Sequence, residues 1–195
     1  AAMHDMLIVS DKAPDFVKNI TSVMMADHGD QLPVSMMPID GTYPSGTTQW
    51  EKRNVSDLVA HWEPDLCIQC GNCAYVCPHS VIRAKFYHKD NLLKAPDGFK
   101  HAPINARGFP ETQYSLQVYL EDCTGCNLCV EVCPATDPAN RSRKAINMGD
   151  KEPVLEQEKA NIDFFENITW NDRSKIDFST VHAAQFLEHL FEFSG

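Results

Sequence analysis

Two segments in the middle of the chain alternate between apolar and polar positions. The first covers residues 80–87 and puts Ile82, Ala84 and Phe86 on one face and Arg83, Lys85 and Tyr87 on the other. The second covers residues 114–120 and alternates through Tyr114, Leu116, Val118 and Leu120. A period of two is typical of a strand with one buried face, so we predict two half-buried strands. The polar stretch 88–112, which Pro and Gly interrupt, is predicted to be a loop.

A helical period is found nearer the two ends of the chain. Residues 14–27 place four apolar side chains on one helical face, namely Phe16, Ile20, Val23 and Met24. Residues 181–191 do the same with Val181, Ala184, Leu187 and either Leu190 or Phe191. These patterns predict helices. Residues 31–50 contain three prolines and two glycines and predict an extended connector. Residues 150–180 show little periodicity and contain many acidic residues.

Composition narrows the class of protein. The 195 residues are 43% apolar and 23% charged, which is typical of a globular chain. No apolar run approaches the roughly 20 residues that cross a bilayer. An acidic residue stands where a signal peptide carries basic ones, so we expect neither a membrane protein nor export. The chain starts without an initiator Met and stops without an obvious terminator, and we expect it to be part of something longer.

The charge is unevenly distributed. The net charge is −10, and the acidic residues are concentrated in the two ends of the chain, 1–66 and 145–195, while the centre is slightly basic. Acidic ends argue against binding to nucleic acid, which requires a basic face.

All eight cysteines lie in an internal repeat of the form C-x2-C-x2-C-x3-C-P. The copies are Cys67, Cys70, Cys73 and Cys77 before Pro78, and Cys123, Cys126, Cys129 and Cys133 before Pro134. In this spacing three thiolates bind one [4Fe–4S] cluster, and the fourth binds the other. We therefore assign Cys67, Cys70, Cys73 and Cys133 to one cluster, and Cys77, Cys123, Cys126 and Cys129 to the second. Gly71 and Gly125 would supply tight backbone beside the sulfurs. A zinc site or a disulfide framework is the alternative, but neither is typical of this spacing.

Two clusters indicate one-electron transfer, and the other motifs do not point to catalysis. The chain contains neither a phosphate-binding G-x-x-x-x-G-K-[ST] loop nor a G-x-G-x-x-G sequence. Four histidines flank the repeat, and we expect exposed polar side chains at His61, His79, His88 and His101. Tyr75 lies inside the first copy, and we expect it to pack against a cluster rather than to relay electrons. The predicted fold class is α+β, with a dicluster bacterial-ferredoxin-like domain between an extended N-terminal linker with a helix and a C-terminal arm.

The residues around the repeat resemble pyruvate:ferredoxin (flavodoxin) oxidoreductase. That family carries an EKR sequence just before a ferredoxin-like domain, as do Glu51, Lys52 and Arg53 here. The segments that resemble the family are GTYPSGTTQWEKRN (41–54), WEPDLCIQCGNC (62–73), APDGFK (95–100), EDCTGC (121–126), KAINM (144–148) and LFEFSG (190–195). The resemblance covers essentially the whole chain.

The resemblance implies a segment of a multidomain enzyme. The family cleaves pyruvate with coenzyme A on thiamine diphosphate and Mg2+, giving acetyl-CoA and CO2, and passes electrons through three clusters to ferredoxin or flavodoxin. The resemblance gives the cluster of the second copy the medial place and that of the first copy the distal place, nearest the acceptor. It implies the end of a preceding domain plus the EKR linker at 1–58, the dicluster domain at 59–149, and at 150–195 an arm toward an absent thiamine domain.

The same resemblance implies that the complete enzyme is a homodimer in the cytoplasm, or in the lumen of an anaerobic organelle if the source is eukaryotic. Membrane and nucleic acid are not expected partners. A free-standing dicluster ferredoxin-type electron carrier is the alternative. The family's acceptors are acidic, so the basic residues of 81–110 are either a solvated loop or a patch that steers the acceptor. They are Arg83, Lys85, Lys89, Lys94, Lys100 and Arg107, against Asp90 and Asp97.

Overall fold

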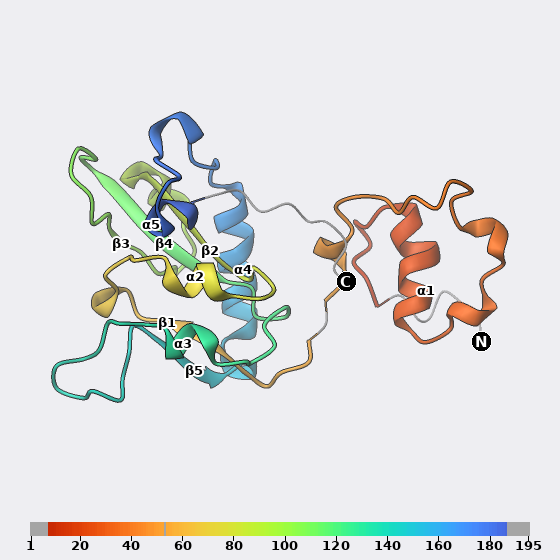
Figure 1. Ribbon diagram of the computed structural model, residues 1–195, viewed down its shortest axis with the longest axis horizontal. Coiled ribbons are helices and arrows are strands. Elements are labelled where there is room, and N and C mark those ends of the chain that lie inside the picture. Colours follow the sequence, from red (N-terminus) through yellow and green to blue (C-terminus); the bar gives the residue numbers. More distant parts are fainter. Residues whose placement is uncertain (1–7, 53, 187–195) are drawn as a thin grey trace. The chain divides into compact units, whose positions relative to one another are not determined.

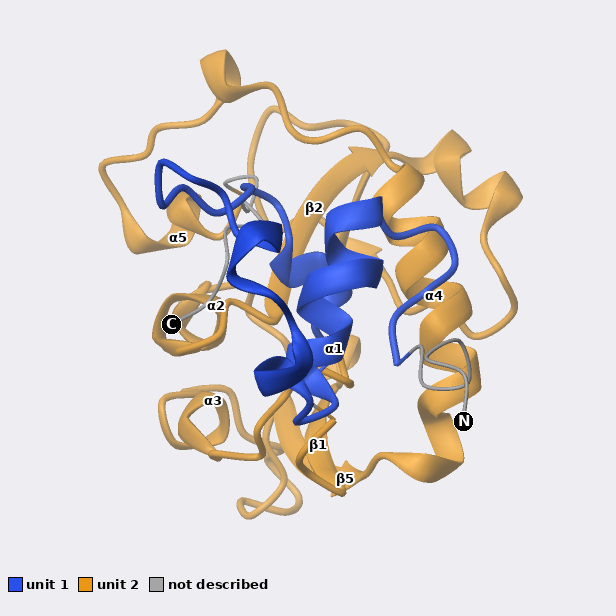
Figure 2. Ribbon diagram, turned by 90° about the vertical axis from the view of Figure 1, so that its right-hand side faces the viewer, with its two compact units in different colours: residues 1–53, 190–195 blue, residues 54–189 orange. Residues whose placement is uncertain are grey.

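A computed structural model describes residues 8–52 and 54–186 of the chain (Figure 1). The chain divides into two compact units, one within residues 1–53 and the other within residues 54–189 (Figure 2). Each unit is described by itself. No helix in these two ranges is both long enough and apolar enough to cross a membrane.

The first unit is built around one short helix. A π-helical turn, Val17–Thr21, leads directly into α1, Ser22–Met25, so the predicted helix forms but ends two residues early. Its buried side is centred on Val17, which packs with Met25 and Trp50. The predicted connector 31–50 is not extended throughout. Three 3₁₀ turns interrupt this region, namely Gly29–Gln31, Val34–Met36 and Thr48–Trp50.

The described residues of the second unit, 54–186, contain two small antiparallel sheets. In the first sheet, β1 (Leu58–Trp62) pairs with β5 (Ile146–Asp150), two segments far apart in the sequence. The second sheet has the order β2–β4–β3, with β2 at Ile82–His88, β4 at Thr112–Val118 and β3 at Ala102–Pro103. The strands β2 and β4 confirm the two strands predicted from alternation, whereas β1, β3 and β5 were not predicted.

Residues 54–186 form four α-helices. They are α2 (Asn72–Val76), α3 (Leu128–Glu131), α4 (Leu155–Asn167) and α5 (Val181–Ala184). Short 3₁₀ turns lie at Pro64–Leu66, Lys89–Lys94, Glu152–Val154 and Arg173–Lys175. The 13-residue helix α4 was not predicted, because residues 150–180 show little periodicity. Helix α5 falls within the predicted helix 181–191, whose residues 187–191 lie outside the described part of the chain.

Helix α4 also explains why the prediction of a half-buried β2 is wrong. The polar face of β2 is covered, and Lys85 is fully buried. Its Nζ donates hydrogen bonds to the carbonyl oxygens of Phe165 at 2.7 Å and Ile168 at 2.5 Å, at the end of α4. The same ammonium lies 4.0 Å from the ring centre of Trp170. A lysine that caps carbonyls and contacts aromatic rings can be buried without losing its partners, so the polar face becomes a second packing surface.

Candidate metal centre

The two copies of the cysteine repeat form loops with the same backbone conformation. Gln69 and Gly125 occupy equivalent positions and both have positive φ, 59° and 68°. Two residues later, Gly71 and Asn127 are again equivalent, with φ of 81° and 66°. Each loop then enters a short helix, and the two helices, α2 and α3, lie side by side (Figures 1 and 2). The repeated sequence therefore produces a repeated structure.

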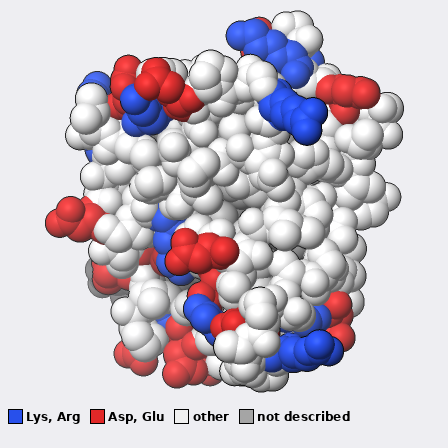
Figure 3. Space-filling view, turned by 90° about the vertical axis from the view of Figure 1, so that its left-hand side faces the viewer, with Lys and Arg blue, Asp and Glu red and all other residues white. Residues whose placement is uncertain are grey.

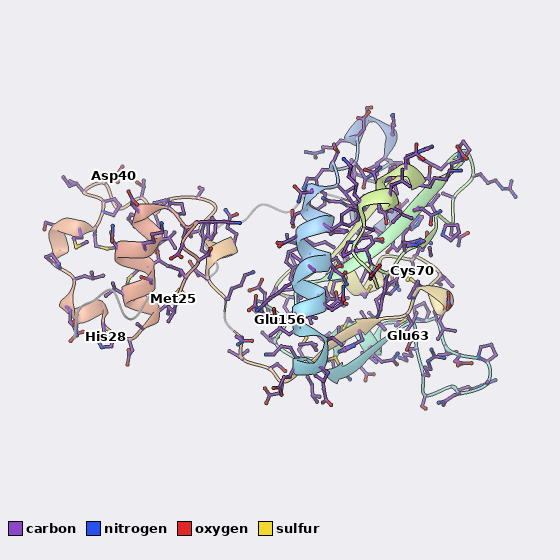
Figure 4. All side chains as sticks on the ribbon, turned by 180° about the vertical axis from the view of Figure 1, so that it is seen from behind. Met25, His28, Asp40, Glu63, Cys70 and Glu156 are labelled. Atoms are coloured by element: carbon purple, nitrogen blue, oxygen red, sulfur yellow. The ribbon has the colours of Figure 1, made fainter. Side chains whose placement is uncertain are left out.

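The first pocket brings together cysteines from both copies of the repeat. Its four thiols belong to Cys67, Cys70, Cys73 and Cys133. Figure 4 labels Cys70 among the side chains of this unit. The pocket has about 340 Å³ of empty space, part of it open to solvent. Its other walls include Trp62, Tyr114, Leu116, Ala145 and Ile146.

The second pocket has the reciprocal composition. Its four thiols belong to Cys77, Cys123, Cys126 and Cys129, so that again one cysteine comes from the other copy of the repeat. It has about 350 Å³ of empty space, nearly the same as the first pocket. Other residues of its lining include Ala60, Val81, Ile82, Leu128 and Met148.

The thiols surround hollows rather than a single point. All eight cysteines are free thiols, without disulfide bonds. Among the residues that the structure describes, no three Cys, His, Asp or Glu side chains are grouped so that they could hold one metal ion. The arrangement in each pocket is thus four sulfur donors around a small hollow that is partly open to solvent.

The environment of the first pocket disfavours free thiolates. Burial raises the pKa of the Cys67 thiol, and the Trp62 indole and the Gln69 backbone N–H partly offset this. The Gln69 N–H donates to the Cys67 sulfur at 3.3 Å. Burial also raises the pKa of Cys73, and the neighbouring Cys67 and Cys70 raise it further. Thiols in such a pocket ionise when a cation compensates their charge, so metal binding would be coupled to proton release.

The second pocket behaves in the same way. Burial raises the pKa of the Cys77 thiol, while backbone N–H groups that follow it in the chain lower it. Burial also raises the pKa of Cys129 to about 11, with smaller contributions from Cys123 and Cys77. Both pockets therefore combine soft sulfur donors with a desolvated setting, which is the environment in which thiolates bind iron.

Several predicted side chains lie elsewhere than expected. Tyr75 is 69% exposed, so the prediction that it packs against a cluster is wrong; it points outward from the single turn of α2. His79, His88 and His101 are exposed as predicted. His61 is half-buried, and its buried Nε2 has no hydrogen-bond partner in the described ranges.

The basic residues of 81–110 do not form one surface patch. Arg83 and Lys85 are buried, and Arg83 stacks on the Tyr119 ring at 4.0 Å. Lys89 is exposed but forms an ion pair with Glu111. On the face in Figure 3, Lys and Arg are interspersed with Asp and Glu around a broad uncharged area. Arg83 and Lys85 therefore serve the packing of this unit, whereas Lys89, Lys94, Lys100 and Arg107 are exposed.

A buried hydrogen-bond network beside the first pocket was not predicted. The Tyr114 hydroxyl donates to Gln185 Oε1 at 2.8 Å, and Gln185 Nε2 donates to the Gln69 carbonyl at 2.9 Å. The Gln69 side chain in turn binds the Pro103 carbonyl at 2.8 Å and the Asn105 N–H at 2.7 Å. The network fixes the loop between Cys67 and Cys70. Its members are 34 to 116 residues apart in the sequence, so no local pattern could have revealed it.

Comparison with known families identifies two regions of the chain. Residues 66–137 match a family described as a 4Fe-4S dicluster domain, and residues 4–56 match EKR, a domain of unknown function. Residues 66–137 are therefore similar to a domain that carries two iron–sulfur clusters. The α+β dicluster fold expected from the cysteine repeat is supported at this level.

The particular relatives are pyruvate oxidoreductases. The chain is 49% identical over 96% of its length to "Probable pyruvate-flavodoxin oxidoreductase" of Escherichia coli K12. It is 46% identical over 95% of its length to the pyruvate-flavodoxin oxidoreductase of Nostoc, and 37% identical over 93% to the pyruvate:ferredoxin oxidoreductase of Moorella thermoacetica. It spans only 15 to 16% of the length of these relatives. The resemblance to this family is confirmed, and the chain aligns with a part of these relatives.

Proposed function

We propose that this chain is the electron-relay segment of a pyruvate:ferredoxin (flavodoxin) oxidoreductase and holds two [4Fe–4S] clusters. One observation carries the proposal: each of two similar pockets is lined by four cysteines, three from one copy of the repeat and one from the other. The relatives' names and the dicluster match support the same function.

The proposed ligands follow the composition of the pockets. Cys67, Cys70, Cys73 and Cys133 would hold the first cluster, and Cys77, Cys123, Cys126 and Cys129 the second. The residues fit such groups because thiolates are the usual ligands of iron–sulfur clusters and the pockets are desolvated. When bound, a [4Fe–4S] cluster accepts and releases one electron at a time.

The chain's own residues would bind the two clusters, orient the cysteine ligands and shield both from water. The residues with positive φ at the equivalent positions of both loops turn the backbone so that amide groups face the sulfurs. One example is the Gln69 N–H, which donates to Cys67. The two sites would be close together, since the charge of Cys129 in the second pocket raises the pKa of Cys73 in the first. A short distance between the two sites would allow an electron to pass from one cluster to the other without a further carrier.

In the complete enzyme, pyruvate and coenzyme A would give acetyl-CoA, CO2, one proton and two electrons. Thiamine diphosphate, Mg2+ and a third [4Fe–4S] cluster would be bound by domains outside this chain, and ferredoxin or flavodoxin would accept the electrons. We propose the division 1–58, 59–149 and 150–195 for the preceding linker, the dicluster domain and the arm. The complete enzyme would be a homodimer.

The proposal is tested by purifying the chain without oxygen and measuring metal content and activity. We expect about eight iron atoms per chain, as two [4Fe–4S] clusters require. We expect no oxidation of pyruvate, even with thiamine diphosphate, Mg2+ and coenzyme A added.

Zinc in place of iron would refute the electron relay. Thiamine-dependent turnover by this chain alone would refute its place as a segment. Fusion to the remaining domains of a relative should restore pyruvate-dependent reduction of flavodoxin or ferredoxin; a free-standing carrier would not restore it.

A further inference from the structure

Trp62 carries a buried hydrogen-bond donor at the wall of the first pocket. It is the last residue of β1, its side chain is almost fully buried at 4% exposure, and it lines the pocket with Cys67. Its indole Nε1 has no hydrogen-bond partner among residues 8–52 and 54–186. Buried N–H groups are nearly always paired, so an unpaired one beside a ligand pocket points to an acceptor that the ligand supplies.

The surroundings hold this indole in place. Its own strand fixes the backbone, because Trp62 pairs with Ile146 across the β1–β5 sheet. Its carbonyl oxygen accepts a hydrogen bond from Lys100 Nζ at 2.9 Å. Its ring meets the Tyr114 ring edge-on, with ring centres 5.7 Å apart. Tyr114 is itself fully buried and bound to Gln185, so the ring has little freedom to turn away.

The acceptor nearest to this donor is a cysteine sulfur. The indole lies close enough to Cys67 to lower the pKa of that thiol against the larger effect of burial. It does not reach hydrogen-bond geometry with any described atom. The Cys67 sulfur already accepts the Gln69 N–H. A second donor aimed at the same sulfur would favour the form that carries more negative charge.

The second copy of the repeat has no tryptophan at the equivalent position. Trp62 stands five residues before the first cysteine of its motif, Cys67, and the residue five before Cys123 is Val118. Valine has no side-chain N–H. Tyr119, the next residue, does have a buried hydroxyl without a partner in the described ranges, but it does not line the second pocket. The two copies thus differ at this position, although the second pocket has polar side chains of its own in His79, Thr124 and Asn127.

We propose that the Trp62 indole N–H donates a hydrogen bond to sulfur at the Cys67 corner of the first cluster and thereby raises the reduction potential of that cluster relative to the second. This inference rests on the proposed function. Reduction by one electron increases the negative charge on the sulfurs, so a donor stabilises the reduced state more than the oxidised one. Trp62 would act on the cluster through the sulfur to which it donates. Of the two clusters, the first would then be reduced at the higher potential and would take up the first electron.

The experiment uses the whole chain with its clusters and two substitutions. Trp62→Phe removes the donor, and Tyr119→Phe removes a buried unpaired donor outside both pockets as a matched control. In a potentiometric titration followed by EPR, Trp62→Phe should need a lower potential for one cluster. At the potential that half-reduces that cluster in the unchanged chain, its ratio of reduced to oxidised form should fall several-fold. The other cluster should be unaffected, and Tyr119→Phe should change neither.

A spectroscopic measurement on the unchanged chain covers the case in which Trp62→Phe loses its cluster. Tryptophan labelled with ¹⁵N in the indole should give a hyperfine coupling to one reduced cluster, and Trp170→Phe should keep it. If the coupling is absent, or if Trp62→Phe retains its iron with both potentials unchanged, the inference is wrong while the proposed relay stands. A chain that binds no iron–sulfur cluster would overturn both.

Discussion

The two cysteine pockets contain the same number of ligands in different surroundings. The first pocket lies against both sheets, through Tyr114 and Leu116 of β4 and through Trp62 and Ile146 of β1 and β5, and the C-terminal helix α5 covers its loop. The second pocket also lies against both sheets, through Ala60 and Met148 and through Ile82 of β2, but here residues 54–58 cross the loop. The repeat determines the arrangement of the thiols, whereas the elements added outside the repeat determine what surrounds each pocket.

Glycines show the same difference in the two loops. A Cβ at Gly71 would lie 3.0 Å from the Val181 carbonyl oxygen, in the segment that covers the first loop. A Cβ at Gly125 would overlap the Ser56 hydroxyl and lie 2.9 Å from the Leu58 carbonyl oxygen, in the linker. The glycines stand at different positions of the repeat, each where a foreign segment makes its closest approach. Each glycine is therefore required by its neighbour as well as by its positive φ.

The largest expected effect comes from replacing the cysteine that each copy of the repeat contributes to the other copy's pocket. Cys77→Ser should remove the cluster of the second pocket although Cys77 belongs to the first motif, and Cys133→Ser should remove that of the first pocket. Iron should fall from about eight to about four atoms in each variant. EPR of the two variants should show different remaining clusters. If Cys77→Ser loses the first cluster and keeps the second, the ligand assignment is wrong.

Gly125→Ala should destabilise the second loop strongly. The positive φ costs about 1 kcal/mol for a residue with a Cβ, and crowding against the linker adds about 2 kcal/mol. Gly108→Ala is the matched control, because Gly108 has φ of 87° and no atom within 4 Å of an added Cβ. Denaturant unfolding should show a greater loss for Gly125→Ala than for Gly108→Ala. Equal losses would show that the linker does not crowd this loop.

Lys85→Met tests the packing of α4 on the three-stranded sheet. It leaves the carbonyl oxygens of Phe165 and Ile168 without the ammonium that binds them. The free energy of unfolding should fall by about 2 kcal/mol, as expected for buried acceptors that lose their donor. The control, Lys89→Met, removes an exposed ion pair with Glu111 and should have little measurable effect. A stable Lys85→Met chain would contradict the structural role of this lysine.

Tyr114→Phe should have the smallest effect and the most local one. It removes the hydrogen bond to Gln185 and should cost about 1 kcal/mol. Hydrogen exchange should accelerate in 181–186, which the bond ties to the first loop. Tyr87→Phe, which loses a bond to Ser115 of similar kind, should leave exchange in 181–186 unchanged. Identical exchange in the two variants would mean that the network does not hold α5.

Local sequence patterns predicted the two groups of cysteine ligands, two strands and the N-terminal helix, because each is specified mainly by residues close together in the sequence. It did not predict β1 and β5, which pair across more than 80 residues and are short. It misassigned the polar face of β2, since a buried Lys85 has the same sequence signature as an exposed one. Trp62 could not be recognised as a donor at the site, because only the folded chain brings its indole beside Cys67.

The central claim is that the two pockets each hold a site for one electron. The most direct test is a controlled-potential titration of the intact, cluster-loaded chain that counts electrons taken up. We predict two electrons per chain in one-electron steps, with EPR showing two reduced clusters that interact magnetically because their sites are adjacent. Uptake of a single electron, or of none despite bound iron, would contradict the account.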